Sequence, residues 1–339
     1  PMIPIDSSTW EMERPSKTGT CLQTFTAELS KRRKTMRTVA ILTAVLVLAG
    51  CTNSKLIIGP LYNRLDDQMR TEFNKLGEFN TAQVEAFEQT VGTFHVWHRQ
   101  SEMPKYATLL SDIAQSIGEK GATSQADVDA WAADLEQFSK NFRDCHPVNY
   151  SIELIQSLSD EQIDFIERRF KGEREKNRER YAGQTKEERV ERRLKNIVKW
   201  SGRLGLNFTT AQKKIIRDSL TEQISLRKEY YQLSSEWNDY LFLLARNQEN
   251  PAYAEALSSH ISNLWTLLER AHPEEWQSIR DLWRNTTYTL IGTFSEPQRA
   301  VTKQWLSKMG RTIDAISKDK PSFKVSNDAS HGCLVAQTN

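Results

Sequence analysis

Residues 79–83 read Phe-Asn-Thr-Ala-Gln, and the same pattern of an apolar residue, a short polar residue and a glutamine returns as LSDEQ at 158–162, FTTAQ at 208–212 and FSEPQ at 294–298. Each copy is typical of a capping box, in which the short polar side chain accepts from the third backbone N–H of a helix and the glutamine reaches back to the cap. The four copies therefore predict four helix starts. Their spacings of 79, 50 and 86 residues do not fit a regular solenoid.

Between these starts, apolar residues recur at spacings of three and four, and no segment alternates with a period of two. The fold class is predicted to be all-α, a multi-helix bundle over 60–318 that is either one body or two helical lobes divided near 145–158. A flexible tail is expected at 319–339. Helices are predicted at 60–76, 80–100, 103–118, 124–143, 148–157, 159–181, 185–204, 209–247, 251–271, 273–292 and 295–317.

The N-terminal part of the chain carries a secretory signal pattern. The apolar run at 38–48 is eleven residues long, too short for the roughly 20 residues of a membrane-spanning helix. Basic residues precede it, and Leu-Ala-Gly-Cys follows at 48–51, a stretch that resembles the lipobox of bacterial lipoproteins. We expect a signal peptide at 36–50, preceded by an upstream extension or long n-region at 1–35 and followed by a lipidated linker at 51–59.

The lipobox resemblance implies that Cys51 carries acyl chains and anchors the protein to a membrane. Thr52 follows this cysteine, where an aspartate would favour the inner membrane, so we expect an outer-membrane anchor that faces the periplasm. Residues 1–50 hold seven Lys or Arg and four Asp or Glu, and removing their +3 from the whole chain's +2 leaves about −1. This charge balance gives no support to nucleic-acid binding.

Two further cysteines remain in the expected mature chain, Cys145 and Cys333. An oxidising compartment permits a disulfide between them, which would close a loop of nearly 190 residues. The alternative is that Cys333 lies free in the tail.

The stretch HVWHRQSEMPKY at 95–106 is the densest polar and aromatic cluster of the chain. We take five of its residues as candidates for binding: Trp97, His98, Arg99, Glu102 and Tyr106. On a regular helix Arg99 and Glu102 would pair across one turn, and Trp97 and Tyr106 would pack where Pro104 begins a new helix. His95 and His98 share a helix face with Glu102, but these are too few ligands for a metal site, and we assign no metal, cofactor or catalytic residue.

Two other features have both a functional and a structural interpretation. Residues 168–203 hold fourteen Lys or Arg and six Asp or Glu, which fits either contact with anionic groups or a solvated helix pair with internal Glu–Arg contacts. Tryptophans are frequent after residue 237, and most should be core, although one or two could line an open groove. The tryptophans concerned are Trp237, Trp265, Trp276, Trp283 and Trp305.

The chain resembles a family of uncharacterised proteobacterial lipoproteins over about 55–318. The resemblance rests on Tyr62-Asn63-x-Leu65-Asp66, the cap after Phe79, and the Trp97–Ala107 stretch. It implies a helical fold and an envelope location without naming an activity. The repeated cap is also similar to the Leu-Thr-x-x-Gln motif of Spy- and CpxP-type periplasmic chaperones, although no copy here matches it fully.

These features together favour a lipid-anchored envelope protein that binds another envelope protein, as a periplasmic chaperone or an adaptor. A structural role, such as a spacer between membrane and cell wall, is one alternative. An enzyme of the hydrolase type is another, with His98 and Glu102 as the residues to test.

Overall fold

The computed structural model of this protein describes residues 59–60, 62–250, 252–319 and Cys333. The predicted signal peptide, Cys51 and most of the 319–339 tail lie outside the described residues, so what the sequence indicates for them stays a prediction.

Every regular element of the described residues is helical, which confirms the predicted all-α class. The elements are α4 (Leu65–Phe73), α5 (Thr81–Trp97), the π-helix η3 (His98–Glu102), α6 (Met103–Gly118), α7 (Gln125–Asp144), the 3-10 helix η4 (Pro147–Tyr150), α8 (Ile152–Gln156), α9 (Asp160–Ala182), α10 (Lys186–Arg203), α11 (Thr210–Glu222), α12 (Arg227–Arg246), α13 (Tyr253–Asn263), the 3-10 helix η5 (Leu264–Thr266), α14 (Leu267–Ala271), α15 (Pro273–Gly292) and α16 (Glu296–Ser317).

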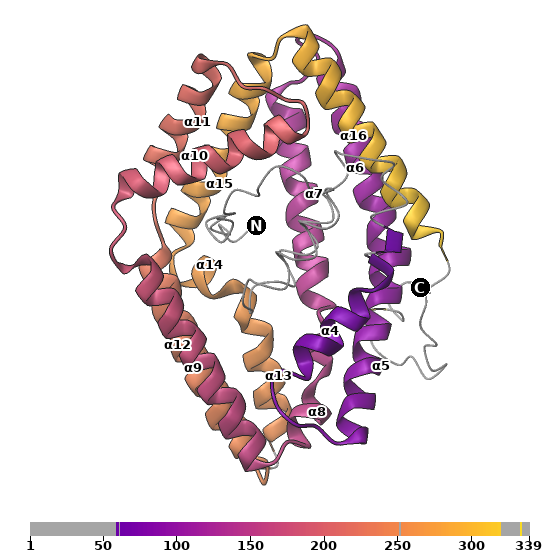
Figure 1. Ribbon diagram of the computed structural model, residues 1–339, viewed down its shortest axis with the longest axis vertical. Coiled ribbons are helices and arrows are strands. Elements are labelled where there is room, and N and C mark those ends of the chain that lie inside the picture. Colours follow the sequence, from indigo (N-terminus) through magenta and orange to yellow (C-terminus); the bar gives the residue numbers. More distant parts are fainter. Residues whose placement is uncertain (1–58, 61, 251, 320–332, 334–339) are drawn as a thin grey trace, which may run out of the picture.

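The molecule is elongated, with helix pairs along its edges (Figure 1). The helices α6 and α16 lie side by side along one edge, and α9 packs against α12 along the opposite edge. Elements α5, η3 and α6 follow one another without a break and form a single long rod. None of the described helices combines the length and apolar character needed to cross a membrane.

The α6–α16 pair is the most extensive helix contact among the described elements. Met103 on α6 packs in one buried cluster with Met309, Ile313 and Ile316 of α16. Gly310 permits the close approach, because a Cβ at this position would lie 3.1 Å from the Ala107 carbonyl oxygen.

Apart from shifts at helix ends, the predicted helices differ from the observed ones in four places. The range 148–157 is the 3-10 helix η4 followed by the short helix α8. The expected junction before Pro104 is the continuous rod α5–η3–α6, in which the first turn of α6 accommodates the proline. The range 209–247 is two helices, α11 and α12. The chain leaves the helix at Gln223, which is buried and whose side chain accepts from Arg193 Nη1 at 2.7 Å, and Leu226 then packs in the core. The range 251–271 is interrupted by η5, where Trp265 packs on His146.

All four predicted capping boxes are present, and the structure adds a further pairwise arrangement. In the first pair, Gln83 Nε2 donates to the Ser157 carbonyl at 2.7 Å, and Gln162 Nε2 donates to the Glu78 carbonyl at 2.6 Å. The two glutamine amides also bond to each other at 3.0 and 3.1 Å. Each glutamine therefore caps its own helix and holds the chain ahead of the other helix.

The second pair repeats these bonds. Gln212 Nε2 donates to the Thr293 carbonyl at 3.1 Å, Gln298 Nε2 donates to the Asn207 carbonyl at 2.8 Å, and the two amides bond at 2.8 and 3.0 Å. The first pair lies at the end of the molecule that holds α8, and the second lies at the opposite end, where α16 begins (Figure 1). We call these two arrangements the glutamine latches.

Candidate functional site

The predicted cluster at 95–106 is centred on the π-helix η3, in the middle of the α5–α6 rod. A π-helix widens the turn and changes which side chains share a face. Four of its five residues are buried, and only Gln100 is exposed. The cluster is therefore in the interior of the protein and not on an open surface.

Arg99 is fully buried and joins the two ends of the described chain. Its Nη1 donates to the Ile316 carbonyl at 2.9 Å, at the C-terminal end of α16, and its Nη2 donates to Asn63 Oδ1. The guanidinium carbon lies 4.8 Å from the ring centre of Tyr62. Burial lowers the pKa of Arg99, but a guanidinium stays protonated in proteins, so a positive charge lies at the negative end of the α16 dipole.

His98 and His95 lie next to this charge. The Tyr62 hydroxyl and His98 Nδ1 are hydrogen-bonded at 2.9 Å, and the Tyr62 ring centre lies 4.5 Å from that of His95. Burial, and next the charge of Arg99, lowers the pKa of His98 to about 4 and that of His95 to about 3. Both imidazoles are therefore neutral at pH 7.

Glu102 has different partners from those of Arg99. It is 1 % exposed, and its Oε1 accepts from Lys105 Nζ at 2.6 Å and from Asn141 Nδ2 on α7 at 3.1 Å. The expected pair of Arg99 and Glu102 is therefore replaced by contacts that join three helices and the N-terminal segment. Nearby, burial raises the pKa of the Tyr106 hydroxyl, with a smaller effect from Glu102.

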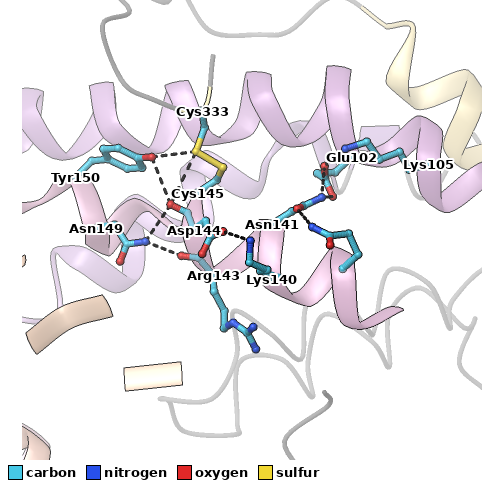
Figure 2. Close-up of a disulfide and its surroundings, with 11 residues drawn as sticks. Glu102, Lys105, Lys140, Asn141, Arg143, Asp144, Cys145, Asn149, Tyr150 and Cys333 are labelled. Atoms are coloured by element: carbon cyan, nitrogen blue, oxygen red, sulfur yellow. Dashed lines mark hydrogen bonds and ion pairs between the residues drawn. A yellow bond between two sulfur atoms is a disulfide. The ribbon is translucent and has the colours of Figure 1, made fainter. Parts of the chain in front are cut away.

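One turn after Asn141, the chain reaches a disulfide between Cys145 and Cys333 (Figure 2). The two Cα atoms are 5.7 Å apart, and the sulfurs are bonded at 2.04 Å. Because a bonded sulfur has no proton, the Tyr150 hydroxyl is the donor in its 2.9 Å contact with Cys333 Sγ. The bridge packs on Phe94 and Trp97, so it closes over the same part of the rod as the buried cluster.

Comparison with known proteins places this architecture in a family. A family model described as a family of unknown function, DUF6279, matches residues 76–270, more than half of the chain. The chain belongs to the DUF6279 family. No curated protein and no solved structure matches it.

The matched DUF6279 segment contains Arg99, Glu102 and Cys145, whereas three of their partners, Asn63, Ile316 and Cys333, lie outside it. It spans less than the 55–318 over which we identified the resemblance. That resemblance included Tyr62 and Asn63, and the structure shows what they do, because both pack against the η3 residues.

The five candidate binding residues do not lie on an open surface of the described protein. Trp97, His98, Arg99 and Glu102 are buried, and Tyr106 is half-buried against Phe138 and the His98 ring. Their side chains hold the N-terminal segment, α7 and α16 against the α5–η3–α6 rod. His98 is 4 % exposed and Glu102 is 1 % exposed in this arrangement.

None of the five tryptophans is openly exposed. Trp237 and Trp276 are buried, and Trp265, Trp283 and Trp305 are half-buried, each in contact with core residues. Among the described residues, no group of three or more His, Cys, Asp or Glu side chains is placed to hold a metal ion.

The glutamine latches are the feature that the sequence analysis missed. Each glutamine was identified as a cap, but its second bond is to a box 79 or 86 residues away. The only signal for such pairing was that the same residue recurred at the same position of all four boxes.

Proposed function

We propose that this DUF6279 protein is a lipid-anchored lipoprotein of the bacterial envelope that acts by binding another protein. Its anchor would be Cys51, and the sorting preference at Thr52 favours the outer membrane, with the helical domain in the periplasm. The Cys145–Cys333 disulfide is compatible with this compartment, because the periplasm permits disulfides and the cytosol does not maintain them.

The observation that carries the proposal of protein binding lies on α12. Leu243 is 61 % exposed and Tyr240 is 49 % exposed, the two highest values among the large apolar side chains of the described residues. They are three positions apart, so they share one face of the helix. Polar residues surround them along the same helix: Gln232, Glu236, Asp239 and Asn247.

The α12 surface is held in a defined orientation. Arg174 pairs with Asp239 at 3.3 Å, and Arg246 pairs with Asp164 and Glu167 at 2.5 Å, so these ion pairs hold the C-terminal half of α12 antiparallel to α9. An apolar pair with a polar rim on a rigid helix is the usual composition of a protein-binding surface.

Site-specific photo-crosslinking in living cells tests this function. A probe at position 243 should give protein adducts, and a probe at Lys120, an exposed residue between α6 and α7, serves as the matched control. One discrete adduct from position 243 indicates an adaptor, and a broad set of envelope proteins indicates a chaperone. Equal adduct yields from positions 243 and 120 would contradict the proposal.

A further inference from the structure

The basic region 168–203 consists of two parts with different environments. On α9, three of the seven Lys and Arg side chains pair with glutamates of the same helix: Lys171 with Glu167 at 2.7 Å, Lys176 with Glu173 at 3.1 Å, and Arg178 with Glu175 at 2.6 Å. This part agrees with a solvated helix that neutralises itself.

The second part begins on α10 and has no such balance. Residues 192–217 contain eight Lys or Arg and not one Asp or Glu. The three acidic residues of α10 all lie in its first two turns, ahead of this basic stretch. Glu188 caps the helix, and Glu191 pairs with Arg217 at 2.6 Å.

The cations of α10 lie on one face. Lys195, Lys199 and Arg203 are four residues apart, so each is turned by about 40° from the last, and the three span roughly 12 Å along the helix. All three are exposed, and none forms an ion pair with a carboxylate of the described residues. The opposite face packs into the core through Val190 and Leu194.

Arg203 also lies over a half-buried aromatic ring. Its guanidinium carbon is 4.4 Å from the ring centre of Trp200, which places an aromatic side chain beside the row of cations. Clusters of Lys and Arg are typical of surfaces that contact anionic lipids, and tryptophan is enriched at membrane interfaces.

We propose that the Lys195–Lys199–Arg203 face of α10 binds the phosphate groups of an anionic membrane surface. This surface would orient the helical domain on the membrane that carries the anchor, and in that respect the inference rests on the lipid anchoring of the proposed function. The charge complementarity itself does not depend on Cys51, so it can be tested without the lipid.

Vesicle co-sedimentation provides the test. The full chain with Cys51→Ser, which cannot be lipidated, is mixed with vesicles of phosphatidylglycerol and phosphatidylcholine, or of phosphatidylcholine alone. Binding should require the anionic lipid and weaken with salt. Removal of the three charges in Lys195→Gln/Lys199→Gln/Arg203→Gln should weaken binding on the order of 100-fold, because each cation near an anionic surface contributes separately.

The control variant Lys171→Gln/Lys176→Gln/Arg178→Gln removes the same charge from α9 and should bind almost as tightly as the parent. A second variant, Lys195→Gln/Lys199→Gln, keeps the Arg203–Trp200 contact and separates loss of charge from local unfolding. Equal binding to neutral vesicles, equal losses in the α9 and α10 variants, or no binding to either vesicle would overturn the membrane contact. None of these results would affect the crosslinking test at position 243.

Discussion

His98 is one of the histidines, with His95 and His146, whose burial lowers the pKa and so couples the stability of this protein to pH. Its pKa in the folded state is about 4, well below the ordinary value of about 6.5 for histidine. The unfolded chain therefore takes up a proton as the pH falls below about 6.5, while folded His98 stays neutral. The free energy of unfolding is therefore unaffected by the protonation of His98 above about pH 6.5 and falls as the pH is lowered towards 4, by about 3 kcal/mol in total.

Urea unfolding at a series of pH values measures this dependence. In His98→Asn, the free energy of unfolding should fall less steeply between pH 6.5 and 4.5 than in the parent. Tyr62→Phe removes the hydroxyl that bonds to Nδ1 but leaves the imidazole buried, so it should lower stability and keep the slope. An unchanged slope in His98→Asn would show that another group is responsible.

At the same scale, the sequence indicated which residues mattered but not what they contact. The stretch 95–106 stands out by composition, and its side chains do form one cluster. Their partners Asn63, Asn141 and Ile316 come from distant parts of the chain, so no local pattern could predict them. The π-helix also changes the i to i+3 relation on which the expected pair of Arg99 and Glu102 depended.

Among the secondary-structure elements, the glutamine latches determine where two pairs of helices begin relative to each other. Gln212→Ala removes the bond that Gln212 Oε1 accepts from the Thr209 backbone N–H, the bond to the Thr293 carbonyl and both bonds to Gln298, which is itself buried. Gln298 keeps its bonds to the Asn207 carbonyl and to the backbone N–H of its own cap residue but loses both bonds to Gln212 in a buried position, so the expected loss is about 2–4 kcal/mol. Thermal or urea unfolding measures it.

The matched control for the latch is the capping box of α7, in which exposed Ser124 and half-buried Asp127 bond to each other and to no second box. Asp127→Ala should cost clearly less than Gln212→Ala. A double-mutant cycle of Gln212 and Gln298 should show strong non-additivity, because each single change already breaks the shared bonds. Additive losses would mean that the two boxes act as independent caps.

Helix starts were predictable because capping is local, and all four boxes begin helices within a residue of the expected position. The break after Gln223 could not be predicted in this way, because it depends on the bond from Arg193, thirty residues earlier. The pairing of the capping boxes could not be predicted either, since it depends on which helix ends meet in space.

For the whole molecule, the two ends of the described chain meet on the α5–α6 rod. Asn63 and the end of α16 are joined through Arg99, and Cys333 is bonded to Cys145 beside Trp97. The N-terminal segment that would lead to the anchor and the C-terminal segment therefore share one attachment region. Loss of either attachment should increase local opening of the chain ends before it affects the helix pairs along the edges of the molecule.

The disulfide is the covalent part of this closure, and its removal should lower the stability of the entire domain. It joins residues 188 positions apart, and on loop-entropy grounds such a bond contributes at most about 5 kcal/mol. We expect reduction of the parent protein to lower its melting temperature, and Cys145→Ser to have the lower value with or without reductant.

Because the bridge restricts the unfolded chain, the loss should appear in the global transition and not only in local opening near Cys333. Hydrogen exchange separates these cases: faster exchange in α9 and α10, far from the bridge, supports global stabilisation, whereas a change confined to α7 and α5 would contradict it.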